Sequence, residues 1–257
     1  SYLTAGQFVK AISSFCGPFI AAFAASMLGN WQYIFPIYAI ITLISTIWLM
    51  STPIKEDAII SKVSSFGNIF ILLKNKTILF LFLGIVFVVG VDVGLNTAAP
   101  KILMERCGLN SIEAGYGTSM YFAFRTAGAF IGAIVLSKFS SAKFFKIVTM
   151  VAVSALIALI FATNKISLFA LFAVIGFSIA NVFSIILSMA IQSRPDKANE
   201  ISGLMITGVF GGAIIPFIMG LTSDVIGSQV GSVLIILLSA IYLVICAYLI
   251  KPKAINK

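Results

Sequence analysis

The stretch TILFLFLGIVFVVGVDVGLNTAAP, residues 77–100, decides the fold. It is almost entirely apolar, and it is longer than the roughly 20 residues that a helix needs to cross a lipid bilayer. Its apolar residues run without the period-two alternation of a membrane-barrel strand. The stretch therefore predicts a membrane-spanning helix that carries one carboxylate, Asp92, well inside the span.

Seven further stretches of the chain have the same character. Each is rich in Ile, Leu, Val, Phe and Ala, and they cover residues 3–28, 33–52, 113–136, 144–164, 166–192, 199–221 and 230–250. Over the whole chain 60% of the residues are hydrophobic and 10% are charged, whereas soluble domains have about 25% charged residues. We therefore expect an all-α polytopic membrane protein with eight transmembrane helices. A soluble enzyme, a disordered tail and a secreted disulfide domain are excluded.

The chemistry available to the chain is narrow. The sequence contains no histidine, which removes most zinc and haem ligation and most catalytic triads. The three cysteines, Cys16, Cys107 and Cys246, are an odd number and two lie in apolar runs, so they imply no disulfide framework. An intramembrane enzyme would need paired acids, a serine with a base or a metal cluster, and one lone Asp supplies none of these. We expect no enzyme activity, no metal and no cofactor.

The positions of Lys and Arg orient the eight spans. One side of the membrane receives twelve of these residues, and the opposite side receives three, Lys101, Arg106 and Lys165. The twelve are Lys55, Lys62, Lys74, Lys76, Lys138, Lys143, Lys146, Arg194, Lys197, Lys251, Lys253 and Lys257. We therefore expect both ends of the sequence on the cytoplasmic side. The formal net charge of +9 then reflects membrane topology and does not indicate a nucleic-acid partner.

One connector stands out by its length and charge. Residues 53–76 divide the chain into two spans followed by six, and the likeness of the first two spans to the last two suggests a six-span repeat. Residues 1–52 would then be the last two helices of an N-terminal half, 53–76 a cytoplasmic loop, and 77–257 a C-terminal six-helix half. The chain begins at Ser1 without a signal peptide, so we expect eight helices of twelve, with four spans missing from this sequence.

Charged groups inside the spans are few and costly, at roughly 2.5–3.5 kcal/mol or more at the bilayer centre. Asp92 is the acid well inside a span, and Arg125 lies near the middle of its own span. Three interpretations of Asp92 stay open: a group that handles protons or substrate, a static ion pair between two helices, or a group wetted at the outer interface. Arg125 has the same alternatives, and we expect it to form an ion-pair network with Asp92. Lys10 either faces the transport pathway or extends to the cytoplasmic interface.

Amide side chains form a second polar set. Gln7, Asn96 and Asn181 carry donors and acceptors that suit a polyhydroxylated substrate, and they can equally hydrogen-bond between helices for about 0.6–2 kcal/mol. Asn96 follows Asp92 by one turn, which places the two residues on the same helix face. The predicted substrate-binding set is therefore Gln7, Lys10, Asp92, Asn96 and Asn181.

Gly and Pro interrupt two of the spans. Gly17 and Pro18 lie in the first span, and Gly211, Gly212 and Pro216 lie in the seventh. Small residues let helices approach closely and Pro frees a backbone carbonyl, so these positions serve either as mobile hinges or as static packing. We predict a gating or packing role for all five and for Asp224, at the outer end of the seventh span.

Four stretches carry a family resemblance. The first stretch, Ser202–Asp224, contains a Gly-Gly pair, a Pro and a terminal Gly-x-x-Ser-Asp. The second, Val88–Asp92, reads Val-Val-Gly-Val-Asp, and the third, Phe124–Gly128, reads Phe-Arg-Thr-Ala-Gly. The fourth consists of Gly17-Pro18 followed by Gly29–Phe35. The first three resemble the eleventh, seventh and eighth helices of the fucose–proton symporter family of sugar permeases. The fourth resembles the passage from the fifth to the sixth helix in the major facilitator superfamily, to which that family belongs.

The resemblance implies helices five to twelve of a twelve-helix transporter, which agrees with the eight spans counted from hydropathy. It also implies that Gln7 lies in the sugar cavity, that Asp92 replaces a Glu or Gln of the family, and that the proton-coupling carboxylates lie on helices outside this sequence. We therefore predict a secondary active transporter of the inner (plasma) membrane. It would move a small polar solute, a sugar, together with protons by rocking two halves in the lipid bilayer, as a monomer when complete.

Two other functions stay open. An exporter of drugs or metabolites in the same superfamily would carry an aromatic, acidic cavity, whereas the cavity candidates here are amides and bases. A non-transporting membrane sensor or scaffold would bind solute without exchanging it across the membrane.

Overall fold

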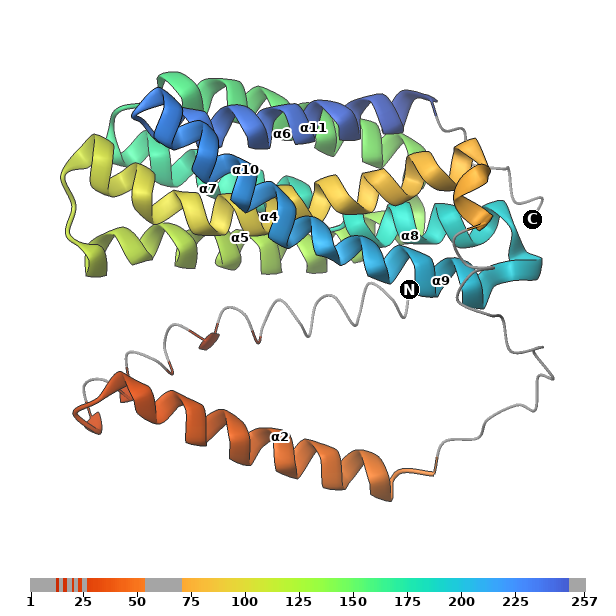
Figure 1. Ribbon diagram of the computed structural model, residues 1–257, viewed down its shortest axis with the longest axis horizontal. Helices are drawn as coiled ribbons and strands as arrows, with labels where there is room; N and C mark the ends of the chain where they lie inside the picture. The colour runs from red at the N-terminus through yellow and green to blue at the C-terminus, as the bar shows by residue number, and fades with distance from the viewer. Residues whose placement is uncertain are drawn as a thin grey trace.

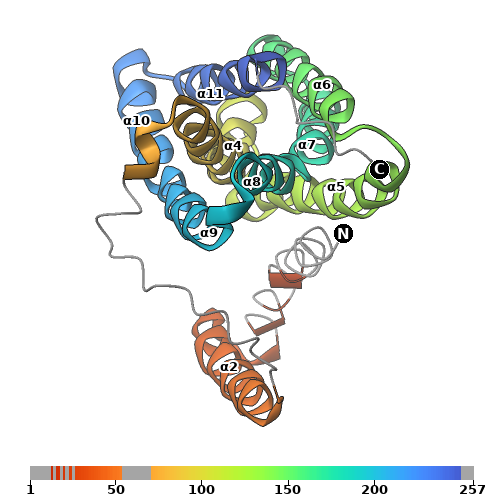
Figure 2. The same ribbon diagram turned by 90° about the vertical axis from the view of Figure 1, so that its right-hand side faces the viewer.

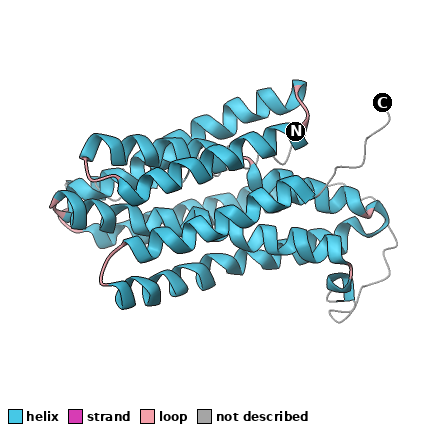
Figure 3. Ribbon diagram, turned by 90° about the horizontal axis from the view of Figure 1, so that it is seen from above, coloured by secondary structure: helices cyan, strands magenta, loops and turns pink. Residues whose placement is uncertain are grey.

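The computed structural model describes residues 27–53 and 71–249, together with six single positions between Ser13 and Ala24. Within this part of the chain every regular element is a helix (Figures 1 and 3). The elements are η1 (Trp31–Tyr33), α2 (Ile34–Ser51), η2 (Leu72–Lys74), α4 (Lys76–Cys107), α5 (Ser111–Lys138), α6 (Ser141–Phe161), α7 (Lys165–Ile179), α8 (Val182–Ser193), η3 (Pro195–Lys197), α9 (Ala198–Thr207), η4 (Gly208–Phe210), α10 (Gly211–Ile226) and α11 (Val230–Leu249).

Seven helical segments of the described residues are long and apolar enough to cross a membrane. Five are single helices, and two, Lys165–Ser193 and Pro195–Ile226, consist of consecutive shorter helices. The all-α membrane fold predicted from hydropathy is therefore confirmed, and the segments fall on seven of the eight predicted spans. The remaining span, 3–28, lies mostly outside the described residues.

The helices from α4 to α11 form one bundle with α4 inside it. α4 packs against α5, α7, α8, α9, α10 and α11, and the end view in Figure 2 shows these helices around it. Glycines on α4 allow this: a Cβ on Gly94 would approach the Met219 sulfur of α10 to 2.7 Å, and a Cβ on Gly90 would overlap Ile215 of the same helix. The position of Asp92, between these two glycines, therefore lies within the bundle.

The helix α2 stands apart from this bundle (Figures 1 and 2). None of its residues is buried, and large side chains such as Trp48 and Met50 are more than half exposed. An apolar helix with no buried face is one whose packing partners are lipid or further protein.

α4 continues beyond the predicted span of 77–100, through Pro100, and ends at Cys107. Proline has no backbone N–H, so the carbonyl of Asn96, four residues earlier, loses its helical donor. The Thr118 hydroxyl of α5 donates to this carbonyl at 3.1 Å, which satisfies it from a neighbouring helix. The 32 residues of α4 make a helix about 48 Å long, which exceeds the roughly 30 Å hydrocarbon core.

Two charged residues at the C-terminal end of α4 bind the ends of two neighbouring helices. The Glu105 carboxylate accepts from the Ser228 hydroxyl at 2.6 Å and from the Gln229 N–H at 2.7 Å, at the start of α11. Nη1 of Arg106 donates to the carbonyls of Leu159 and Ala162 at the end of α6. An anion at a helix N-terminus and a cation at a C-terminus are both stabilising, so α4 fixes the positions of both helices.

Candidate functional site

A cluster of three polar side chains joins α4 to α5 inside the bundle. The Tyr121 hydroxyl donates to Oδ1 of Asp92 at 2.5 Å, and Nη2 of Arg125 donates to Oδ2 of Asp92 at 2.9 Å. Nε of Arg125 lies 2.7 Å from Oδ1 of Asp92, which makes the pair a salt bridge. We call Asp92, Tyr121 and Arg125 the carboxylate cluster.

The spacing of the cluster on α5 explains its geometry. Tyr121 and Arg125 are four residues apart, so they project from one face of the helix toward the same point on α4. Tyr121 is fully buried, the Arg125 side chain is 7% exposed and the Asp92 side chain is 19% exposed. The carboxylate is therefore the member of the cluster that a solute or water reaches most easily.

The cluster is not fully satisfied internally. Nε of Arg125 is buried and, despite its proximity to the carboxylate, is not directed along a hydrogen bond to any described residue. A buried guanidinium retains its charge, and a buried ion pair gains its stability only when the remaining N–H groups are also bonded. Nε of Arg125 is thus held next to the carboxylate by charge and not by an aligned hydrogen bond.

Asn96 and Asn181 occupy different environments. Asn96 is half-buried one turn beyond Asp92, and its side chain makes no hydrogen bond within the described part of the chain. Asn181 is 1% exposed and lies at the break between α7 and α8, where its Nδ2 donates to the Gly128 carbonyl of α5 at 2.7 Å. Its Oδ1, like the hydroxyl of Ser184, is buried without a partner among the described residues.

α5 connects these environments. Arg125 precedes Gly128 by three residues, or about 4.5 Å along the helix, so Asn181 contacts α5 close to the carboxylate cluster and toward the Lys138 end. A Cβ on Gly132 would overlap the Asn181 amide, and a Cβ on Gly128 would lie 2.5 Å from the Phe177 carbonyl. Only glycine at these positions lets α7 and α8, which together form a span broken at Asn181, approach α5 so closely.

The predicted gating or packing residues differ in their surroundings. A Cβ on Gly211 would overlap the Val86 carbonyl of α4, and one on Gly212 would lie 3.1 Å from a methyl group of Val93, so both glycines stand at a tight helix contact. Pro216 lies inside α10, and Asp224 is exposed near its end. The short helix η4 directly before Gly211 interrupts the α-helical pattern of this span.

Gln7, Lys10 and Pro18 lie outside the described residues. Gly17 is half-buried, and a Cβ there would lie 3.5 Å from the Tyr38 hydroxyl of α2. Among the described residues no group of three His, Cys, Asp or Glu side chains could hold a metal ion, and the three cysteines are free.

Tyr121 was not among the predicted site residues. Its signal in the sequence is its position four residues before Arg125, but an aromatic residue at helical spacing is usually core. Only the packing of α4 against α5 identifies its hydroxyl as a partner of Asp92.

The bundle of long apolar helices with a buried ionic cluster defines the class, a polytopic helical membrane protein with polar groups inside. Residues 6–215 match the family described as Major Facilitator Superfamily. The chain belongs to this superfamily, which consists of transporters and not of enzymes.

Solved structures support the same fold. The chain is similar to a Major Facilitator Superfamily transporter, FucP, in the outward conformation, with 22% identity and a TM-score of 0.70 over 84% of this chain and 53% of that one. It is also similar to the E. coli fucose:proton symporter FucP (N162A), with 21% identity and a TM-score of 0.72 over 88% of this chain and 56% of that one. The resemblance found in the sequence is confirmed.

Curated relatives are similar over a shorter region. The chain is 26% identical over 155 residues to a putative glucose/galactose transporter of Helicobacter pylori, which is 60% of this chain and 38% of that protein. It is 26% identical over 147 residues to a glucose/galactose transporter of Brucella abortus, which is 56% of this chain and 35% of that protein. The aligned part is therefore less than half the length of the curated relatives.

Proposed function

We propose that this protein is a secondary active transporter that moves a small polar solute, a sugar, together with protons by alternating access. The carboxylate cluster is the observation that carries the proposal. It places an ion pair and a phenol inside a bundle of apolar helices, and a charge in the membrane interior is costly enough that it marks a functional site by default. The similarity to glucose/galactose transporters supports a hexose as the solute.

The chemistry of the cluster fits this task. The carboxylate of Asp92 is the most accessible member of the cluster, and it can accept a hydrogen bond from a sugar hydroxyl or bind a proton. Binding of either one weakens the interaction of the Asp92 carboxylate with Arg125 or Tyr121. The contact between α4 and α5 changes as a result. The two arrangements of α4 and α5 would belong to the outward-open and inward-open states of the protein. A solute or proton shifts the balance between these states because it binds one of them more tightly than the other.

Around this cluster we propose that Gln7, Lys10, Asn96 and Asn181 also contact the solute. The Asn96 side chain has no partner among the described residues, and Asn181 has its donor occupied and its Oδ1 acceptor free. Asn181 is thus suited to accept one sugar hydroxyl while it holds the broken span against α5. Gly17, Pro18, Gly211, Gly212 and Pro216 serve gating or packing in this proposal.

The same proposal assigns the parts of the chain. Residues 1–52 belong to an N-terminal six-helix half, 53–76 are the cytoplasmic loop between halves, and 77–257 form the C-terminal half, with both ends of this sequence in the cytoplasm. The isolation of α2 from the bundle supports this division. We place the protein in the inner membrane, as a monomer surrounded by lipid, where the two halves rock about a site near the midplane.

The test is uptake by membrane vesicles that contain the full chain. Vesicles preloaded with unlabelled glucose or galactose should accumulate the labelled sugar by counterflow, and an inward proton gradient should drive net uptake. In Asp92→Asn vesicles we expect the rate of net uptake or its pH dependence to change. Binding without counterflow would instead indicate a sensor, and unchanged uptake with unchanged pH dependence in Asp92→Asn would remove Asp92 from the mechanism.

A further inference from the structure

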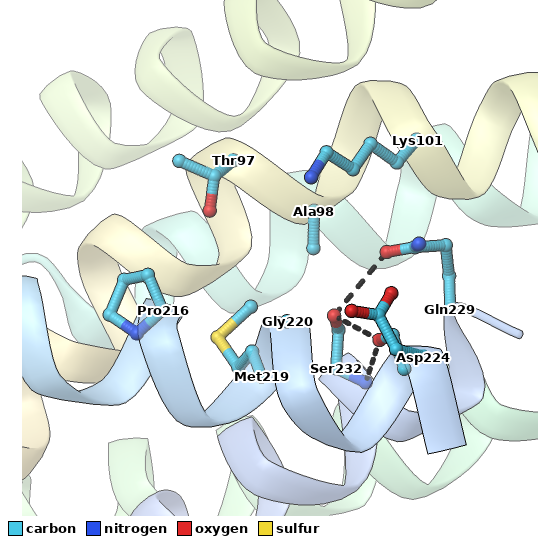
Figure 4. Close-up of a pocket in the computed structure, with 10 residues that line it drawn as sticks. Thr97, Ala98, Lys101, Pro216, Met219, Gly220, Asp224, Gln229 and Ser232 are labelled. Carbon is cyan, nitrogen blue, oxygen red and sulfur yellow. Dashed lines mark hydrogen bonds between the residues drawn. The ribbon is translucent and has the colours of Figure 1, made fainter. Parts of the chain in front are cut away.

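A second polar site lies at the end of the bundle where α4 ends and α10 turns into α11. It is a pocket of about 240 Å³ that opens between these three helices (Figure 4). The residues that line it are Thr97, Ala98, Lys101, Pro216, Met219, Gly220, Ser223, Asp224, Gln229 and Ser232.

The pocket exists because α4 and α10 diverge. Nearer the middle of the bundle the two helices touch closely, since a Cβ on Gly211 would overlap Val86 and one on Gly94 would meet the Met219 sulfur at 2.7 Å. At Gly220, two turns further along α10 than Gly212, a Cβ would have no heavy atom within 4 Å. The space between the helices is therefore open at this end.

The residues at the base of the pocket are already hydrogen-bonded to one another in the absence of a ligand. The hydroxyls of Ser223 and Ser232 lie 2.8 Å apart, the Ser232 N–H donates to Oγ of Ser223 at 3.0 Å, and the Ser232 hydroxyl donates to Oε1 of Gln229 at 3.3 Å. The carboxylate of Glu105 holds the Gln229 backbone in place. A preorganised network of this kind does not have to be ordered when a ligand binds.

The walls carry hydrogen-bonding groups that nothing in the described part of the chain uses. Lys101 and Asp224 are exposed and make neither an ion pair nor a hydrogen bond there, and the Gln229 amide nitrogen is also without a partner. Figure 4 shows Lys101 on α4 and Asp224 and Gln229 on the opposite side, directed at the same space. The pocket therefore offers an ammonium donor, an amide donor and a carboxylate acceptor.

We propose that this pocket is a second sugar-binding subsite, separate from the carboxylate cluster. A neutral polyhydroxylated ring satisfies all three groups at once, because its hydroxyls donate to Asp224 and accept from Lys101 and Gln229. A solute of either charge would leave one of the two pocket charges unpaired. The volume of about 240 Å³ is below the roughly 300–1,000 Å³ of pockets for drug-sized ligands, which suits one monosaccharide ring.

The subsite is distinct from the cluster because the two use different faces of α4. Asp92 faces Tyr121 and Arg125 of α5, whereas Thr97, Ala98 and Lys101 face α10 and α11. The inference rests on the proposed sugar transport, and on the orientation in which this end of the bundle is outside the cell. A sugar would then occupy this pocket before it reaches Asp92.

Uptake kinetics of the full chain test the subsite. Asp224→Asn and Lys101→Gln remove one charge each and preserve size, and each should raise the half-saturation concentration for glucose or galactose about tenfold, with the maximal rate within twofold of the parent. Glu113→Gln changes an exposed acid at the same end of the bundle but outside the pocket, so it should leave both constants unchanged. An unchanged half-saturation concentration, or a fall in maximal rate alone, would overturn the subsite while sugar transport itself stands.

Thiol labelling measures occupancy without transport. In a Cys107→Ser background, Thr97→Cys should react with a membrane-impermeant thiol reagent, and glucose or galactose should slow that reaction about tenfold. The protection should disappear in Asp224→Asn and persist in Asp92→Asn. Loss of protection in Asp92→Asn only, or no protection by either sugar, contradicts the subsite; protection in a protein that transports neither sugar would retain the pocket and reject the proposed transport.

Discussion

The Tyr121 hydroxyl donates a 2.5 Å hydrogen bond to the carboxylate of Asp92, and this bond joins two helices at the only acid inside the span 77–100. Tyr121 is fully buried, so its hydroxyl has no access to water as an alternative partner. A buried hydroxyl that loses its acceptor costs the free energy of its desolvation. Tyr121 and Asp92 therefore depend on each other, and a change at the Asp92 carboxylate acts directly on α5.

We predict that Tyr121→Phe slows sugar uptake in a protein that still folds. The ring stays in place, while the carboxylate loses a hydrogen bond of a kind that contributes about 1.5–3 kcal/mol. Sugar uptake should slow, because the Asp92 carboxylate is then bound to α5 by Arg125 alone. The measurement is the initial uptake rate at a fixed pH.

Tyr116→Phe is the matched control, since Tyr116 lies on the same helix and is 61% exposed. It should leave the uptake rate unchanged. If Tyr121→Phe also leaves the rate unchanged, the hydrogen bond between Tyr121 and Asp92 plays no part in transport.

A second prediction concerns the ion pair itself. Arg125→Gln leaves the Asp92 carboxylate without its cationic partner inside the membrane, and the loss of one member of a buried pair costs about 3–5 kcal/mol. Asp92→Asn leaves Arg125 similarly unpaired. The double variant Asp92→Asn/Arg125→Gln should be more stable than either single variant, because neither charge is then left unpaired.

The double-mutant cycle is measured as thermal unfolding of the purified protein in detergent. Strictly additive losses in the two single variants would show that the salt bridge has no coupling energy. In that case the pair would not link α4 to α5, and the proposed mechanism would lose its central contact.

The spans and the class of fold were predictable from the sequence because each depends on about 20 consecutive apolar residues. The partners of Asp92 were predictable only in part. Arg125 is the one base near the middle of a later span, so charge alone suggested it. Tyr121 required knowledge of how α5 is rotated against α4, which residue type does not specify.

The unpredicted features all depend on contacts between distant segments. α4 continues through Pro100 because Thr118, on another helix, occupies the freed carbonyl. The break at Asn181 is stabilised by a carbonyl of α5. Neither bond leaves a signal in the local sequence, where Pro predicts a helix end and Asn181 is one polar residue in an apolar run.

A third prediction tests the close contact between α5 and the broken span. Gly128→Ala puts a methyl group 2.5 Å from the Phe177 carbonyl, so the helices have to separate and the protein should lose about 1–3 kcal/mol of stability. Gly115→Ala, on the same helix, has nothing within 4 Å of the new methyl group. It should be neutral or stabilising by up to about 1 kcal/mol.

The two variants are compared by thermal unfolding and by the rate of counterflow. Equal stability of Gly128→Ala and Gly115→Ala would mean that α5 and α7 do not pack as closely as the structure has them.

The last prediction isolates the bond that carries α4 past its proline. Thr118→Val is close to isosteric and removes the donor to the Asn96 carbonyl, so it should destabilise the protein by about 1–3 kcal/mol. Pro100→Ala restores the backbone N–H at residue 100, which can then bond to the same carbonyl within the helix. In the Pro100→Ala background, Thr118→Val should therefore cost much less. Thr126→Val serves as the control, since the Thr126 hydroxyl bonds only the Phe122 carbonyl of its own helix, and its cost should be the same in both backgrounds. A cost of Thr118→Val that does not depend on residue 100 would show that the hydroxyl acts elsewhere than on the carbonyl that Pro100 leaves free.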